Sequence, residues 1–183
     1  MKTFLVLFLS LIPCFALAED RAAEVLRRIN MVRRSHGLEP VVHEQRLAVA
    51  ARSQSDWMAS VGRMEHLREQ ARSFDDFRHG NYHPSNRVVN SGYFAFEDLY
   101  HLESLPNGVV VHPLPEANEK VGEIIAKGWG GNDSGSPARV VEGWMNSPGH
   151  RKEILKGNYR EAGVAITSPR PGEFYWCVVF AYR

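Results

Sequence analysis

The chain has 183 residues and carries 22 lysine and arginine side chains against 21 aspartate and glutamate side chains. A chain of this length can bury the core of one domain. Because the charges nearly cancel, bulk electrostatics does not favour nucleic acid or an acidic lipid surface, and we expect no nucleic-acid partner. Composition therefore favours one globular domain whose function lies in a local site.

The first 18 residues have the pattern of a secretory signal. A lysine near the start precedes the apolar run FLVLFLSLIPCF, and a small-residue segment ends at Ala18, where we predict cleavage. A lipid-modified cysteine normally follows a small residue, whereas Pro13 precedes Cys14, so a lipid anchor is not predicted. No later stretch is long and apolar enough for a transmembrane segment. The sequence thus predicts a signal peptide at 1–18 and a secreted, extracellular domain at 19–183.

Two amphipathic helices are predicted at the start of this domain. Apolar side chains recur at helical spacing in residues 21–35 and again in residues 44–60. Gly37 and Gly62 follow these two segments, as is common at helix ends. We expect both helices to pack on one core.

The middle of the chain has no clear period. Residues 67–118 are rich in aromatic residues, and prolines and glycines interrupt them. We expect a long, partly irregular insertion within the single domain, with its aromatic side chains packed over the core. Residues 121–127 fit either a strand or a loop. Ser136 and Pro137 then have the pattern of a helix start.

The C-terminal part predicts strands. Residues 162–167 and 174–182 are apolar, and a Pro-Gly turn at 171–172 separates them, which predicts an antiparallel hairpin buried against helices. Cys177 lies in the second strand and has no cysteine partner once the signal is removed, so buried packing is favoured over reactivity. Helices first and strands last in one short chain indicate an α+β layered fold.

The segment WMNSPGHRKEIL at 144–155 places a histidine in the first turn of a predicted helix. Ser147 is a favoured N-cap residue, and Pro148 favours the first helical position. His150 then lies at the positive end of the helix dipole, which disfavours imidazolium, so we expect a neutral ring at neutral pH. A neutral imidazole can bind a metal or accept a proton.

Another histidine pair has the one-turn spacing with which two imidazoles bind zinc on a helix, namely His79 and His83. Gly80 and Pro84 disfavour a helix there, so we interpret the pair as surface or packing residues.

Three further residues of chemical interest lie far apart in the chain: His66, Glu123 and His150. Each has a simpler explanation, since a histidine in a folded domain is often only hydrogen-bonded and a glutamate is often a surface charge. Nothing in their local spacing brings them together.

Several segments occur in a specific order. They are INMVRRSHGLEPVV, MEH at 64–66, GEIIAKG at 122–128, WMNSPGHRKEIL followed by NYREAGVAI, and the closing YWCVVFAY. Together they resemble the CAP superfamily of cysteine-rich secretory proteins, antigen 5 and pathogenesis-related proteins, in its bacterial SCP-like form. The resemblance covers most of residues 22–66 and 120–182. It implies an α+β fold, a three-layer α-β-α sandwich with a small central antiparallel sheet.

The resemblance also places His66, Glu123 and His150 on positions that line a central cleft in the family. We therefore predict that these residues form a ligand-binding cleft that can also hold a divalent metal, with zinc as the expected ion. Two neutral imidazoles and one carboxylate give a His₂Glu face with open positions for water or ligand.

Three departures make this cleft less polar than the family pattern. Ser147 stands where many eukaryotic members carry a second acidic residue, Ile124 replaces an amide, and residues 177–178 are Cys-Val where Thr-Gln is common. Glu142 lies nearby in sequence but on another part of the helix, so we do not include it. The loss of polar groups weakens the case for catalysis.

The resemblance implies a secreted binding module, and the expected ligand is a lipid, a peptide or a cell-wall fragment. One alternative is a metal-dependent hydrolase or peptidase in the same cleft, with Glu123 as the base and a zinc-bound water whose pKa falls toward about 7. Another is a structural extracellular protein in which the histidines simply hydrogen-bond to Glu123. No strong nucleophile–base motif is present, so binding is favoured over catalysis.

Overall fold

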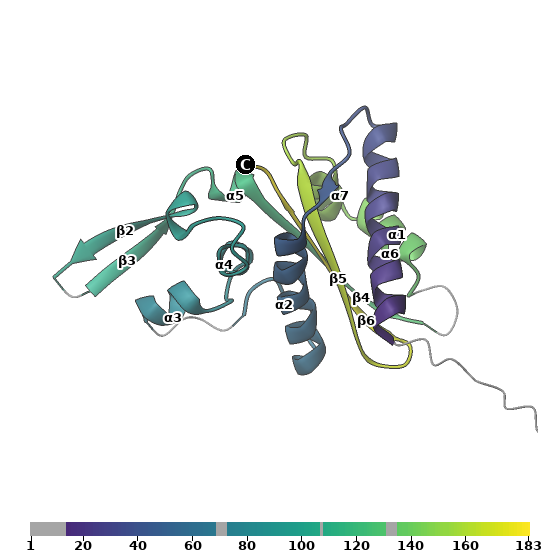
Figure 1. Ribbon diagram of the computed structural model, residues 1–183, viewed down its shortest axis with the longest axis horizontal. Helices are drawn as coiled ribbons and strands as arrows, with labels where there is room; N and C mark the ends of the chain where they lie inside the picture. The colour runs from purple at the N-terminus through teal and green to yellow at the C-terminus, as the bar shows by residue number, and fades with distance from the viewer. Residues whose placement is uncertain (1–13, 69–72, 107, 131–134) are drawn as a thin grey trace, which may run out of the picture.

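The computed structural model describes residues 14–68, 73–106, 108–130 and 135–183. Most of the predicted signal peptide therefore lies outside the described residues, and cleavage after Ala18 stays a prediction. Among the described helices, none is long and apolar enough to cross a membrane. The chain builds a four-stranded sheet between two layers of helices, which confirms the predicted α-β-α sandwich (Figure 1).

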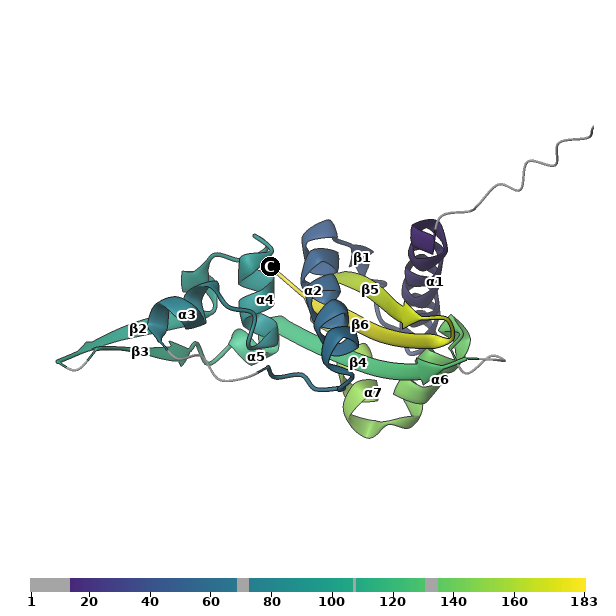
Figure 2. The ribbon, with the colours of Figure 1, turned by 90° about the horizontal axis from the view of Figure 1, so that it is seen from below.

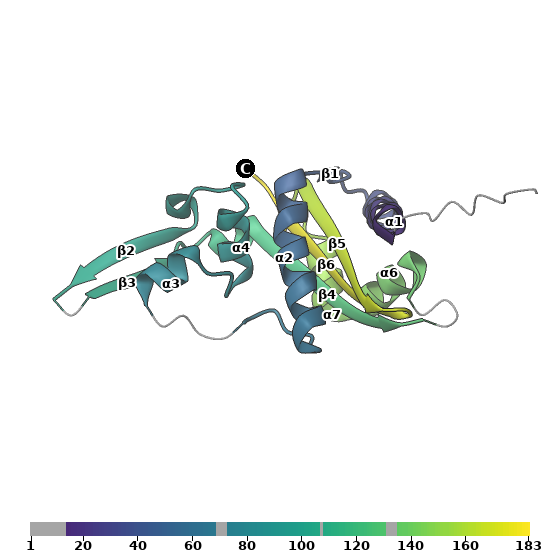
Figure 3. The same cartoon turned by 60° about the horizontal axis from the view of Figure 1, so that its bottom comes forward.

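The two long helices, α1 (Cys14–Ser35) and α2 (Gln45–Val61), lie on opposite sides of the sheet (Figure 1, Figure 3). They confirm the helices predicted at 21–35 and 44–60. Gly62 ends α2 in the left-handed conformation with a φ of 72°, and its N–H donates to the Met58 carbonyl at 2.9 Å. A residue without a Cβ adopts this conformation without strain, which is why the helix stops there.

The strand order of the sheet is β1-β5-β6-β4, with bounds β1 (Val42–His43), β4 (Val121–Trp129), β5 (Glu161–Arg170) and β6 (Glu173–Ala181). The hairpin of β5 and β6 confirms the predicted C-terminal strands, and Gly172 in its turn has a φ of 83°. Strand β4 pairs antiparallel with β6, so residues 121–127 form a strand rather than a loop. The short β1 pairs in parallel, at the edge beside β5.

Side chains of β6 reach the core on both faces of the sheet. Trp176, Val178 and Phe180 pack on the side of α1, while Tyr175 and Cys177 pack on the side of α2. Because successive residues of a strand point to opposite faces, an unbroken apolar run is what a strand covered on both faces requires. The buried, free thiol of Cys177 confirms its predicted packing role.

The described part of residues 67–118 is more regular than expected. It contains α3 (Phe74–His79), α4 (Pro84–Asn90), a 3-10 helix η1 (Phe96–Asp98), β2 (Tyr100–Leu105) and β3 (Gly108–Pro113), and α5 (Ala117–Lys120) follows. These elements are too short to produce a sustained period in the sequence. Local caps start two of them: Ser73 accepts a hydrogen bond at the start of α3, and His83 does so at the start of α4.

The aromatic residues of this insertion pack as predicted. The Tyr100 ring stacks on Phe96 at a centroid distance of 4.9 Å and meets the edge of Phe77 at 5.4 Å. Tyr93, Phe96 and Tyr100 belong to the core on the α2 side of the sheet. The β2–β3 hairpin extends beyond this cluster, away from the sandwich (Figure 2).

Helices α6 (Pro137–Asn146) and α7 (Pro148–Ile154) start as the sequence predicts, each with a serine before a proline. The Ser136 hydroxyl accepts a hydrogen bond from the Arg139 N–H at 3.4 Å, whereas the Ser147 side chain makes no cap bond. The indole of Trp144 donates to the Ile125 carbonyl at 3.0 Å, which fixes α6 against β4. Helix α7 also packs against β4, the strand that carries Glu123.

Candidate functional site

His66 and Glu123, which are 57 positions apart in the chain, meet in the structure. The His66 ring nitrogen Nδ1 lies 3.0 Å from Glu123 Oε1. The Glu123 side chain is 1 % exposed and the His66 side chain is 44 % exposed, so the imidazole covers a buried carboxylate and faces solvent on its other side.

His66 lies on the loop that follows α2 in the chain. Two buried polar side chains hold this loop in place. The Gln54 amide donates to the Glu65 carbonyl, and Arg87 Nη2 donates to the His66 carbonyl at 3.1 Å. Both hydrogen bonds are partly buried, where an unpaired backbone carbonyl is costly. The loop is therefore positioned by α2 and α4, which explains how a residue outside any regular element reaches β4.

Arg87 is the functional residue that the sequence reasoning missed. It lies on α4, its side chain is fully buried, and its Nη2 donates to Glu123 Oε2 at 2.6 Å. Its Nη1 donates to the Asn81 carbonyl at 3.0 Å. One signal could have pointed to it: a glutamate inside the apolar segment VGEIIA needs a cationic partner if its strand is buried.

Both oxygens of Glu123 are thus engaged, one by an imidazole and one by a guanidinium. Burial raises the pKa of the Glu123 carboxyl group, but the Arg87 charge and the hydrogen bonds from His66 and Arg87 outweigh burial, so the pKa is lowered from its ordinary value. The carboxylate stays ionised and is a weak base. It is an ion-paired anchor for His66.

His150 lies in the first turn of α7 and is half-buried. Burial lowers the pKa of its imidazole, and the positive charge that His66 can carry lowers that pKa further. This direction agrees with a neutral ring, although its cause is burial rather than the helix dipole. Among the described residues His150 makes no hydrogen bond to His66 or Glu123, so its link to His66 is electrostatic.

The coupling between the two histidines can be measured. In a His66→Ala variant we expect the pKa of His150 to rise, because a like charge is removed from its surroundings. A pH titration of the ring carbon and proton resonances by NMR reports this shift. His79→Ala is the matched control, since His79 is a more exposed histidine that ends α3. An unchanged His150 pKa in His66→Ala would show that the two rings do not share a site.

Two more basic side chains border the site. His83 is half-buried, and burial and the Arg87 charge lower the pKa of its imidazole. Burial, followed by the Arg87 charge, lowers the pKa of Arg68 to about 10. Arg68 Nη2 donates to the Ser53 carbonyl at 2.6 Å. The surroundings of Glu123 therefore contain several basic side chains and one carboxylate.

The one-turn spacing of His79 and His83 does not reflect a shared helix. His79 is the last residue of α3, Gly80 follows it, and His83 caps α4 before Pro84. The half-buried position of His83 and its cap on α4 agree with its interpretation as a surface or packing residue, and the charges of Arg87 and Glu123 act on its pKa.

The Cys177 thiol lies behind the carboxylate and donates a weak hydrogen bond to it. Its Sγ lies 3.6 Å from Glu123 Oε2, and burial raises the pKa of the thiol well above its ordinary value. The thiol is therefore protonated and inert toward nucleophilic chemistry.

The donor set does not fit a divalent metal ion. Among the described residues, no group of three or more histidine, cysteine, aspartate or glutamate side chains is arranged to hold one. Arg87 bonds to Glu123 Oε2 and His66 bonds to Oε1, so a cation at this carboxylate would compete with both contacts and be repelled by the Arg87 charge. The predicted metal role of His66, Glu123 and His150 stays a prediction that this geometry does not favour.

A cavity of about 720 Å³ lies elsewhere, between α1 and α2, and none of the three predicted site residues lines it. The candidate site is instead the contact between the His66 loop and Glu123 of β4, and His150 at the start of α7 is linked to it through the charge of His66.

The three-layer sandwich, with a histidine placed against a buried glutamate of the central sheet, defines an SCP-like domain. The chain belongs to the cysteine-rich secretory protein (CAP) family, whose family model matches residues 26–180. A curated relative, the uncharacterized protein YkwD of Bacillus subtilis, is 51 % identical over 43 residues. That match covers 24 % of this chain and 15 % of the relative.

Solved structures show the same fold at low sequence identity. An extracellular protein of Bacillus anthracis that contains an SCP domain matches with a TM-score of 0.63 and 17 % identity, over 91 % of this chain and 42 % of its own. An outer surface protein of Borrelia burgdorferi matches with a TM-score of 0.61 and 16 % identity, over 90 % of this chain and 94 % of its own. This chain thus spans less than half of the first protein and nearly all of the second.

Proposed function

We propose that this protein is a secreted ligand-binding domain, and that His66, anchored by Glu123, and His150 contact a lipid, a peptide or a cell-wall fragment. The observation that carries this proposal is the double engagement of the Glu123 carboxylate by His66 and Arg87. The histidines remain able to offer ring nitrogens to a ligand, because His66 is partly exposed and His150 is half-buried.

The same observation disfavours the hydrolase alternative. A general base works best when its pKa lies near the working pH, whereas the pKa of Glu123 is lowered. The structural alternative, in which the histidines only hydrogen-bond to Glu123, agrees with the His66 contact but gives no role to the half-buried His150.

Binding and turnover can be tested in one series. The purified protein is incubated with lipid vesicles, peptidoglycan fragments and a mixed peptide library, and retained and altered molecules are identified by mass spectrometry. We expect retention without turnover, and a loss of affinity by about tenfold or more in His66→Ala and in His150→Ala. His79→Ala serves as the control histidine variant.

Other outcomes would reject the proposal. Cleavage of a substrate that disappears in a folded Glu123→Gln variant would establish the hydrolase. Equal retention by the protein and both site variants would remove His66 and His150 from the binding surface.

Zinc titration tests the metal role separately. We expect calorimetry to give the same heats for the wild-type protein, His66→Ala and His150→Ala, because Arg87 already neutralises the carboxylate that a zinc ion would need. Stoichiometric zinc uptake that His150→Ala abolishes would restore the metal hypothesis.

A further inference from the structure

One edge of the central sheet is open over part of its length. Strand β1 has two residues, and the N–H groups of Val42 and Glu44 donate to the carbonyls of Arg160 at 2.8 Å and Ala162 at 2.9 Å. Strand β5 continues to Arg170, and among the described residues no strand pairs with its outer edge beyond Ala162.

The register shows which backbone groups face this open edge. In an antiparallel pair, the backbone groups of alternate residues point away from the partner strand. Because Ala162 bonds outward to Glu44, the N–H and C=O groups of Val164 and Ile166 also point outward from β6. The Ile166 carbonyl accepts a hydrogen bond from Arg52, which confirms this orientation. Both groups of Val164 and the N–H of Ile166 are left for another partner.

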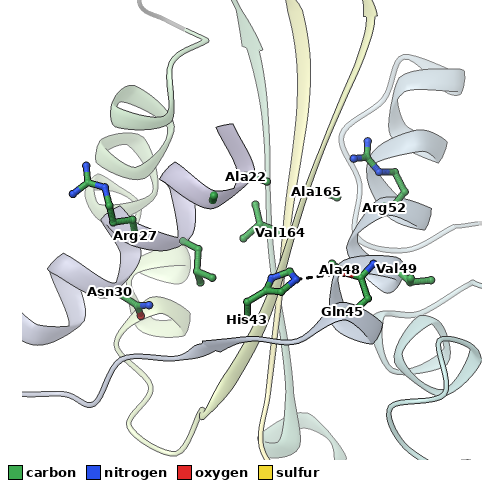
Figure 4. A pocket seen from close by; sticks show the side chains of 12 residues that line it. Ala22, Arg27, Asn30, His43, Gln45, Ala48, Val49, Arg52, Val164 and Ala165 are labelled. Carbon is green, nitrogen blue, oxygen red and sulfur yellow. Dashed lines mark hydrogen bonds between the residues drawn. The ribbon is translucent and has the colours of Figure 1, made fainter. Parts of the chain in front are cut away.

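The cavity of about 720 Å³ lies over this edge, with α1 on one side and α2 on the other (Figure 4). Ala22 and Leu26 line it from α1, Ala48 and Val49 line it from α2, and Val164 lies on its floor. Val164 is only 6 % exposed, so its unpaired backbone groups are at the bottom of a groove with apolar walls.

The unpaired backbone groups at the bottom of the groove determine which class of ligand fits it. Backbone N–H and C=O groups at the bottom of an apolar groove need hydrogen-bond partners, which a hydrocarbon chain lacks and an extended peptide supplies. A strand added here would have a helix over each of its faces. Strands covered on both faces are apolar at successive positions rather than at alternate ones.

The charges around the groove add one further requirement. Its lining contains Arg27, Arg52 and His43 and no aspartate or glutamate. Arg27 donates to both carboxylate oxygens of Glu24, at 2.6 Å and 2.7 Å, so the positive charge of Arg27 is already neutralised. Arg52 lies beside the Ile166 end of the edge; it forms an exposed ion pair with Asp56 at 4.0 Å, which is weak at that separation, and its side chain stays 39 % exposed. The lining therefore complements an acidic side chain beside Arg52.

We propose that the groove between α1 and α2 captures an extended peptide segment of a partner protein as an added strand on β5. The segment has consecutive apolar residues and one acidic residue, which lies beside Arg52. This binding surface is separate from the surface at His66 and His150 and does not depend on it.

The probe for this proposal is the synthetic peptide acetyl-Thr-Val-Ile-Val-Asp-Thr-amide. We expect it to slow hydrogen exchange of the Val164 and Ile166 amides by about tenfold or more at saturation, as measured by NMR, because both N–H groups gain a partner. A peptide of the same sequence with N-methylated valines lacks the N–H groups that would donate to the Val164 carbonyl, and its methyl groups block strand pairing, so it serves as the backbone control. Absence of binding, or binding that protects amides elsewhere, overturns the proposal.

Charge reversal at Arg52 tests the second requirement. Arg52→Glu is expected to lose affinity for the aspartate peptide by about tenfold and to bind the same peptide with lysine in place of aspartate. Arg34→Glu, at an exposed position near the end of α1, is the control and should change neither affinity. A misfolded variant would bind neither peptide, so binding of the lysine peptide shows that Arg52→Glu is folded. If Arg52→Glu binds both peptides as the wild-type protein does, the predicted acidic residue is wrong.

Discussion

Arg87→Met is expected to lower the free energy of unfolding by about 3–5 kcal/mol, the usual cost of removing one partner of a buried ion pair. The variant leaves the Glu123 carboxylate buried without its guanidinium and removes the donors to the Asn81 and His66 carbonyls. Urea unfolding followed by tryptophan fluorescence measures the change. Arg78→Met is the matched control, because Arg78 forms an exposed pair with Glu97 at 3.9 Å and should change stability by about 0.5 kcal/mol or less.

The pH dependence of this effect has a definite sign. In the wild-type protein the folded-state pKa of Glu123 is lowered, so its contribution to stability is present above the unfolded-state pKa and is lost as the pH falls through the folded-state pKa. Without Arg87, burial dominates and raises the folded-state pKa above the unfolded-state value of about 4.3. As the pH falls, Glu123 of the folded variant binds a proton, and the destabilisation caused by its buried charge is lost. The stability difference between the two proteins should therefore shrink on acidification.

A second substitution separates the buried charge from lost packing. Arg87→Met combined with Glu123→Gln removes both charges, and we expect it to be more stable at neutral pH than Arg87→Met alone. A stability difference for Arg87→Met that is small and independent of pH would contradict the buried ion pair. So would a double variant that is no more stable than the single one.

Local patterns were sufficient for the elements that form the sandwich. Both long helices show an apolar repeat followed by glycine, and the C-terminal hairpin shows two apolar runs around Gly172. Strand β4 could not be assigned in the same way, because its apolar run is short and contains Glu123, and its identity depends on pairing with β6. The short elements of residues 73–120 depend on caps and on aromatic contacts, which a search for periods does not detect.

The candidate site was only partly accessible from the sequence. The family resemblance pointed to His66, Glu123 and His150, and the fold brings the first two into contact. It did not point to Arg87, because α4 lies in the segment that the resemblance leaves uncovered. Whether a carboxylate serves as a metal ligand, a base or an ion-pair partner depends on such long-range neighbours. For that reason the sequence pointed to the contact of His66 with Glu123 but not to the ion pair that sets the role of this carboxylate.

Gly163→Ala is the second substitution for which we expect a large loss of stability, about 3 kcal/mol or more. Gly163 lies on β5 beneath α2, and a Cβ there would lie 2.0 Å from the Ala48 nitrogen and 2.1 Å from the Leu47 carbonyl carbon. Both are backbone atoms of the helix, so no side-chain rotation relieves the overlap and α2 has to move away from the sheet. Thermal and urea unfolding measure the loss.

The displacement of α2 should also reach the candidate site. The loop with His66 follows α2 directly, and Gln54 of α2 holds this loop through the Glu65 carbonyl. We therefore expect the His66 ring resonances to shift in Gly163→Ala, because the 3.0 Å contact with Glu123 is lost or lengthened. Gly143→Ala is the matched control: nothing lies within 4 Å of a Cβ at this position in α6, so the variant should gain about 0.5–1 kcal/mol from helix propensity. If Gly163→Ala is as stable as Gly143→Ala, close packing of α2 on β5 does not position the site.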